Sequence, residues 1–180
     1  MKIITLIATL MLTCGAAFSR EQVAIETSMG NITVTLDSEK APKNVMFFLK
    51  HMEEGVYQGS AFHSVDQTNI MGGIPAKTAS GYSSSGNISC RKGAPGEFNL
   101  KNVRGALVLG RTVGGCNPLK NSNSTQFGIY FADDPKDQGE FTVIGYVTEG
   151  MDVVDKIASA LKSKSKTAIA ILDIHLVSAK

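Results

Sequence analysis

Two short segments hold the residues best suited to chemistry. The first, residues 61–73, opens on an aromatic–histidine pair, Phe62-His63, continues as a polar run and closes on a double glycine. A glycine pair permits backbone angles that are closed to other residues, so the chain can turn there or let another backbone approach. The second segment, residues 121–130, is a polar loop that enters a short apolar run. We interpret the two segments as parts of one candidate site.

Motifs of several other chemistries are missing from the sequence. There is no Gly-x-Ser-x-Gly elbow, no phosphate-binding Walker loop and no His-Glu-x-x-His zinc motif. Asp133, Asp134 and Asp137 do not follow the spacing of a calcium loop, and Pro135 interrupts them. We interpret these aspartates as a solvated turn, and we expect neither a metal nor another cofactor.

Residues 1–19 have the layout of a secretory signal peptide. Lys2 precedes an apolar run over residues 3–12, and small residues follow it at 16–19. The apolar run is too short to span a bilayer; the alternative is a buried N-terminal strand or helix. The predicted organisation is a signal peptide at 1–19 and one domain at 20–180, in a secreted or periplasmic protein.

The charge balance does not point to a polyanionic partner. The formal net charge is +2, and removal of Lys2 with the leader would lower it to +1. We therefore expect neither nucleic acid nor, after signal cleavage, a membrane as partner.

Hydrophobic periodicity predicts a mainly β fold with two helices. Residues 23–36 alternate as a β-hairpin with its turn at 29–31. A helix is expected from Pro42 to a stop at Gly55, with His51 on a solvated face. The other predicted elements are short strands near 61–63, 70–72, 106–109, 127–131 and 141–148, a second helix at 151–161 and a last strand at 169–177. Periodicity alone leaves a barrel and a sandwich open.

The two candidate segments resemble the signatures of the cyclophilin family. In that family the first reads roughly Phe-His-Arg-Val-Ile-Pro-x-Phe-Met-Ile-Gln-Gly-Gly, and the second roughly Asn-x-x-x-Ser-Gln-Phe-Phe-Ile. Residues 145–157 also resemble the family's Gly-Lys-Val-x-x-Gly-Met-Asp-Val-Val pattern. The resemblance extends over essentially all of residues 20–180. It implies a closed eight-stranded antiparallel barrel capped by two helices.

The resemblance also implies peptidyl-prolyl cis-trans isomerase activity. Rotating an X–Pro bond breaks amide resonance, against a barrier of about 18–20 kcal/mol. It requires no nucleophile, metal or cofactor, but an apolar pocket for the proline ring and hydrogen-bond donors that favour the twisted state. The implied substrates are proline-containing peptides or unfolded envelope proteins, bound by a monomer.

The residues implied for the site depart from the family pattern. Ser64 stands at the position of the catalytic arginine, Met71 at that of the glutamine before Gly-Gly, and Gly128 at that of the second phenylalanine. The resemblance gives Ser64 and Gln126 catalytic roles. The implied substrate-binding residues are Phe62, His63, Thr68, Asn69, Met71, Gly110, Arg111, Gly128, Asp137 and Phe141. We therefore expect reduced activity, with a non-catalytic peptide- or protein-binding module as the rival hypothesis.

Two cysteines remain after removal of the leader, Cys90 and Cys116. Pairs in secreted chains are more often bridged than free, and the corresponding loops of the family border each other, so a disulfide is expected. A minor alternative makes Cys116 a thiol nucleophile with His63 as a distant base.

Overall fold

The computed structural model describes residues 20–75, 93–111, 115, 117–122, 125–163 and 168–177. The expected signal peptide, residues 1–19, lies outside the described residues. Cys90 and Cys116 also lie outside them, so the predicted disulfide stays a prediction.

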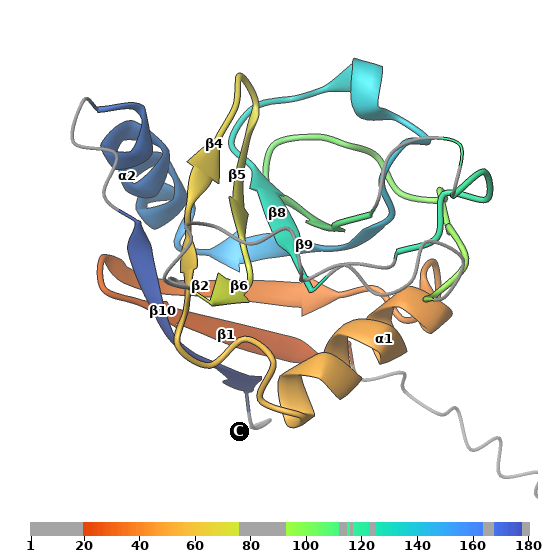
Figure 1. Ribbon diagram of the computed structural model, residues 1–180, viewed down its shortest axis with the longest axis horizontal. Coiled ribbons are helices and arrows are strands. Elements are labelled where there is room, and N and C mark those ends of the chain that lie inside the picture. The colour runs from red at the N-terminus through yellow and green to blue at the C-terminus, as the bar shows by residue number, and fades with distance from the viewer. Residues whose placement is uncertain are drawn as a thin grey trace, which may run out of the picture.

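The described chain forms a β-barrel with one α-helix along each of two sides (Figure 1). The strands are β1 (Gln22–Thr27), β2 (Gly30–Leu36), β3 (Ser60–Phe62), β4 (Ser64–Val65), β5 (Asn69–Gly72), β6 (Ile74–Pro75), β7 (Ala106–Leu109), β8 (Phe127–Tyr130), β9 (Val143–Glu149) and β10 (Ile169–Leu176). The helices are α1 (Pro42–Glu53), α2 (Met151–Lys162) and the short 3-10 helix η2 (Pro135–Asp137). Within the described chain, no helix is both long and apolar enough to cross a membrane.

The ten strands follow the order β4-β5-β8-β7-β9-β2-β1-β10-β3-β6, and the paired strands are antiparallel. His63 alone separates β3 from β4, and Gly73, with φ at +93°, separates β5 from β6. Each pair is therefore one strand with a bend, which gives eight continuous strands. Because β3 pairs with β10 while β4 pairs with β5, the bent strand joins the two ends of the sheet. The predicted antiparallel barrel with two helices is therefore confirmed in kind, although the structure divides it into ten strands where eight were predicted.

Alternating side chains of the strands and one stripe of each helix fill the barrel. Its centre holds Phe127, whose ring lies 5.7 Å from that of Phe62, 5.4 Å from that of Tyr57 and 6.1 Å from that of Phe48. All four side chains are at most 2% exposed. This aromatic group joins α1 to the sheet and fixes β8, the strand that ends the second candidate segment.

The prediction that His51 lies on a solvated face of α1 is wrong. The side chain is only 8% exposed. Its Nδ1 lies 2.8 Å from the carbonyl oxygen of Phe47, and its ring packs edge-on against the Phe47 ring at 4.3 Å. Tyr57, after the end of α1, also lies against it, with ring centroids 6.4 Å apart. The helix periodicity could not show that the following turn covers this position.

A second, smaller apolar cluster lies on the outer face of β7, β8 and β9. It consists of Ala106, Val108, Tyr130 and Val143, with Leu100, Phe141 and Tyr146 packed against it. The residues between them in the strands, such as Leu107 and Ile129, belong to the main core. The sheet therefore has an apolar layer on both faces at this place, and the outer layer borders the candidate site.

Candidate functional site

Strand pairing places three of the predicted site residues in one row on the outside of the barrel. Ser64 on β4 is opposite Met71 on β5, Met71 is opposite Gly128 on β8, and Gly128 is opposite Val108 on β7. Residues in register point to the same face of a sheet, and neighbouring strands lie about 4.8 Å apart. Ser64 is exposed and Met71 is half-buried. We call this row, from Ser64 to Val108, the outer row.

The Met71 side chain lies over Gly128. A Cβ on Gly128 would lie 2.8 Å from Met71 Sδ, 3.3 Å from the carbonyl oxygen of Ile70 and 3.3 Å from Val108 Cγ2. A side chain at position 128 would therefore have to displace the thioether. The resemblance implies a phenylalanine ring at position 128. In the structure, the Met71 side chain of the neighbouring strand lies there instead.

A polar turn between β4 and β5 borders the outer row. The Asp66 carboxylate accepts hydrogen bonds from the backbone N–H groups of Thr68 and Asn69, each at 2.8 Å, and from the Asn69 side-chain amide at 2.8 Å. The Thr68 hydroxyl donates to Asp134 at 2.6 Å, and mainly this bond holds the pKa of the Asp134 carboxyl below its usual range. Thr68 and Asn69 are thus fixed by aspartates of the protein itself.

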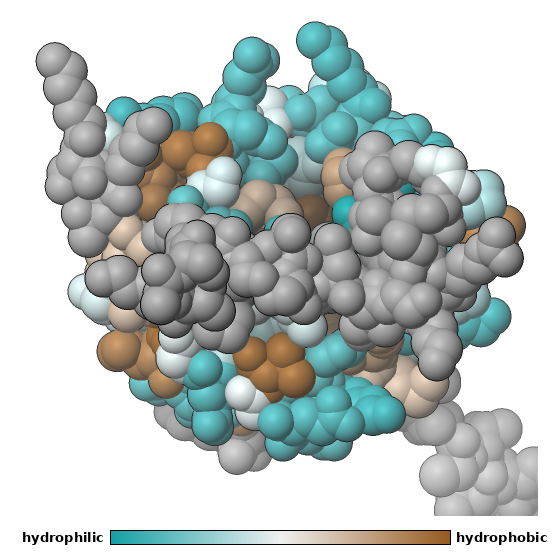
Figure 2. All heavy atoms as spheres, viewed as in Figure 1, coloured by the Kyte–Doolittle hydropathy of each residue, from teal (hydrophilic) through white to brown (hydrophobic). Residues whose placement is uncertain are grey.

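Asp137 is bound to the buried tyrosine of the outer cluster. Tyr130, in register with Asn69, is fully buried, and its hydroxyl donates to the Asp137 carboxylate at 2.5 Å. Burial, and then this hydrogen bond, raise the pKa of the Tyr130 hydroxyl. Asp134 also caps η2 by accepting from the N–H groups of Lys136 and Asp137. Hydrophilic residues gather over η2 and the turn between β4 and β5 in the view of Figure 2.

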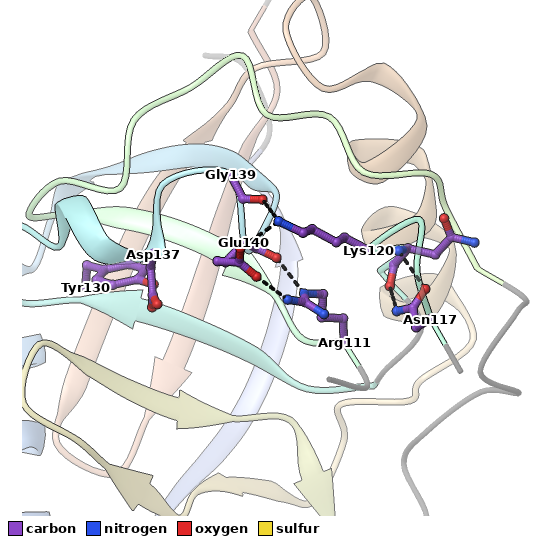
Figure 3. A network of polar contacts seen from close by, with 8 residues as sticks. Arg111, Asn117, Lys120, Tyr130, Asp137, Gly139 and Glu140 are labelled. Carbon is purple, nitrogen blue, oxygen red and sulfur yellow. Dashed lines mark hydrogen bonds and ion pairs between the residues drawn. The ribbon is translucent and has the colours of Figure 1, made fainter. Parts of the chain in front are cut away.

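Arg111 lies in a network of ion pairs at the rim of the site (Figure 3). Its guanidinium donates to the Glu140 carboxylate at 2.6 Å and to the Glu140 carbonyl at 2.5 Å, and lies 5.2 Å from the ring centroid of Phe141. The Lys120 ammonium donates to the same carboxylate at 2.6 Å. The Arg111 side chain is only 6% exposed. Arg111 is therefore held as a structural cation of the rim.

Gln126 and Gly110 meet where β7 ends and β8 begins. The N–H of Gly110 donates to the carbonyl oxygen of Gln126 at 2.8 Å. Gln126 stands two residues before Gly128 on the same chain segment, and Phe141 packs against the outer cluster that contains Val108. The rim is therefore connected directly to the strands that carry the outer row.

Phe62 and His63 occupy different environments. Phe62 is fully buried among the core aromatics, so it supports the strand from inside the barrel and does not line the outer surface. His63 borders a small cleft of about 170 Å³ together with Ser64, Val65 and Leu161 of α2. Burial lowers the pKa of His63 below its ordinary value, because burial disfavours the charged ring.

Four residues fix this surface but were not predicted as site residues: Asp66, Tyr130, Asp134 and Glu140. Asp134 was predicted only as part of a solvated turn. Asp66 offered a signal, because an aspartate two or three residues before the backbone N–H groups it binds is typical of a turn. Among the described residues, no group of three or more His, Cys, Asp or Glu side chains is arranged to hold a metal ion.

An antiparallel barrel with two covering helices, in which the strands of the Phe-His and Gln-Phe segments lie side by side, is typical of the cyclophilin-like class of folds. The family model of the cyclophilin-type peptidyl-prolyl cis-trans isomerases matches residues 22–176. The chain belongs to this family.

Relatives and solved structures agree. A probable peptidyl-prolyl cis-trans isomerase of Brucella suis is 33% identical over 165 residues, covering 85% of this chain and 79% of the relative. Peptidyl-prolyl cis-trans isomerase A of Dickeya dadantii is 33% identical over 153 residues, covering 79% and 74%. The crystal structure of a cyclophilin-type isomerase of Cryptosporidium parvum matches with a TM-score of 0.73 and 26% identity, covering 89% of this chain and 99% of that one.

Replacing Glu140 by glutamine should reduce stability in a pH-dependent way. Lys120, and then Arg111, hold the pKa of the Glu140 carboxyl below its ordinary 4.5. A depressed folded-state pKa contributes stability above the unfolded-state pKa, and the contribution is lost as pH falls through the folded-state value. Urea unfolding between pH 3 and 7 should therefore show the largest difference between wild type and Glu140→Gln above about pH 5, shrinking toward pH 3.

The control for this measurement is Glu149→Gln, at the exposed end of β9. It should change the unfolding free energy little at any of these pH values. A difference between wild type and Glu140→Gln that stays constant from pH 3 to 7 would contradict the ion-pair explanation.

Proposed function

We propose that this protein is a peptidyl-prolyl cis-trans isomerase that acts slowly on proline-containing segments of secreted or envelope proteins. Its membership of the isomerase family and the cyclophilin-like barrel support the activity. The observation that carries the reduced rate is the outer row, where the exposed residue after Phe62-His63 is Ser64 and its neighbours are Met71 and Gly128.

The proposed mechanism uses hydrogen bonds and burial alone. The proline nitrogen becomes an acceptor only when the amide twists, so a donor at position 64 stabilises the transition state more than the ground state. A charge-assisted hydrogen bond contributes about 1.5–3 kcal/mol and a neutral one about 0.5–1.5 kcal/mol. A serine in place of an arginine therefore accounts for a loss of about tenfold in rate. Gln126, directly before the start of β8, would orient the peptide from the rim.

The proposed compartment and substrates follow from the expected signal peptide. A leader at residues 1–19 would direct the domain to the periplasm or outside the cell. There it would meet proline-containing stretches of unfolded envelope proteins, as a monomer and without nucleic acid or a cofactor.

A protease-coupled isomerisation assay on a proline tetrapeptide tests this proposal. The domain of residues 20–180 should have a kcat/KM about ten- to a hundredfold below that of the Dickeya dadantii relative measured in parallel, because both the donor and the ring pocket are altered. Equal values would contradict the proposal and direct attention to another donor, with Arg111 the first to be replaced.

One observation favours a second function, that of a non-catalytic peptide- or protein-binding module. The Met71 thioether over Gly128 leaves less room for a proline ring. Binding of proline and non-proline peptides with similar affinity, without any measurable turnover, would favour this second function.

A further inference from the structure

We infer that Met71 is a specificity-determining residue of the outer row, and that its side chain fills the space over Gly128 in which the proline ring of a peptide would bind. The inference rests on the proposed function and names what limits binding at that site. Its basis is the contact between Met71 Sδ and the position of a Cβ on Gly128, 2.8 Å apart.

The contact follows from strand pairing. Met71 and Gly128 are directly opposite each other in the antiparallel pair of β5 and β8, so their Cβ directions lie side by side. Because glycine has no side chain, the space above it is left to its neighbour, and methionine is flexible enough to fill such irregular gaps. Val108 bounds the same space from β7, with its Cγ2 3.3 Å from the Cβ position.

The backbone of β5 is fixed, so only rotation of the Met71 side chain can clear the space. The N–H of His63 donates to the Met71 carbonyl at 3.0 Å. A Cβ on Gly72 would lie 2.9 Å from the Phe62 ring, and one on Gly73 would lie 2.5 Å from the Thr125 carbonyl oxygen. These close approaches hold the strand against the core. A peptide that inserts a ring must therefore displace a packed thioether.

This role makes a distinct kinetic prediction. Met71 obstructs the ring in the ground state and in the transition state alike, so its removal should lower KM and leave kcat nearly unchanged. A donor at position 64 acts on the twisted state and should change kcat. The two positions can thus be separated by the parameter that each one moves.

The test compares Met71→Ala with wild type on two N-blocked peptides that differ only in Ala-Pro against Ala-Ala. Binding is followed by NMR titration, and KM and kcat come from the isomerisation assay on the proline peptide. Met71→Ala should bind the proline peptide about tenfold more tightly, since part of the proline ring becomes buried, and should bind the Ala-Ala peptide as tightly as wild type does. KM should fall by the same factor, and kcat should stay within about twofold.

Two further variants support the comparison. Met52→Ala removes a half-buried methionine of α1 that packs against the main core, and it should leave the proline-to-alanine affinity ratio as in wild type. Met71→Gln nearly keeps the volume of the side chain, so it provides the test if Met71→Ala does not fold. Its amide favours water over the apolar space above Gly128, and a smaller gain in the affinity ratio is expected.

The outcomes separate this inference from the proposed function. An unchanged affinity ratio in folded Met71→Ala or Met71→Gln overturns the role of Met71, whatever the wild-type rate. If the wild-type rate is also low, the proposed function stands without the role of Met71. If the wild-type rate equals that of the Dickeya dadantii relative, the proposed function and the role of Met71 both fail. A higher ratio with lower KM supports the role of Met71.

Discussion

Replacing Phe127 by alanine should lower the free energy of unfolding by about 3–5 kcal/mol, the range for a large aromatic side chain removed from a packed core. Phe127 is fully buried and contacts the rings of Phe48, Tyr57 and Phe62. These residues come from α1, the turn after it and β3, so the cavity left by truncation cannot be closed by one local movement. Urea denaturation followed by circular dichroism measures the effect.

Leu119→Ala is the control for the core truncation. Leu119 is 74% exposed, so its truncation should change the unfolding free energy by less than about 0.5 kcal/mol. A loss below about 1 kcal/mol for Phe127→Ala would mean that the aromatic group is not the centre of the core, and that the packing of α1 on the sheet depends on other contacts.

The order and kind of the elements could be predicted because local periodicity determines them. Ala106–Leu109, Pro42–Glu53 and Met151–Lys162 lie within about two residues of their predicted bounds. The first hairpin turn was misplaced by about one residue, because β2 begins at Gly30 itself. Gly30 pairs with Thr27 in the ladder, and the Thr27 hydroxyl donates to its carbonyl oxygen, which a pattern of apolar residues does not reveal.

The chemistry of the site was less predictable, because it depends on contacts between strands that are distant in the sequence. Resemblance to a family pattern identifies Met71 and Gly128 as two separate departures from that pattern. Only the register of β5 against β8 shows that the two departures are related. The Met71 side chain lies over Gly128, which has no side chain of its own. The same holds for Thr68 and Asp134, which are joined by a hydrogen bond across two loops.

The register also changes what is needed to restore an efficient site. Ser64→Arg alone should raise kcat by about tenfold at most, because it exchanges a neutral donor for a charged one and leaves the ring space filled. Gly128→Phe in addition would bring its side chain into Met71 Sδ and close to Val108. Part of the new burial would then be offset by displacing the methionine, so the double variant should gain less than two independent sites would.

The triple variant Ser64→Arg, Met71→Gln, Gly128→Phe should therefore show the largest gain, about a hundredfold or more in kcat/KM over wild type. It supplies the charged donor, a polar group at position 71 that leaves the space above residue 128, and an aromatic side chain at position 128 that takes up part of that space as a wall for the proline ring. Because Met71 lies over Gly128 and is opposite Ser64, the gain of the triple variant should exceed the product of the gains of the three single variants.

Ser28→Arg, in the exposed turn between β1 and β2, is the matched control for the added positive charge and should leave kcat/KM unchanged. All variants are compared in the protease-coupled assay after their unfolding transitions show that they are folded. A triple variant no better than Ser64→Arg would mean that Met71 and Gly128 do not limit proline binding, since the donor alone would then account for the whole deficit. This measurement therefore tests whether the residues of the outer row limit activity together.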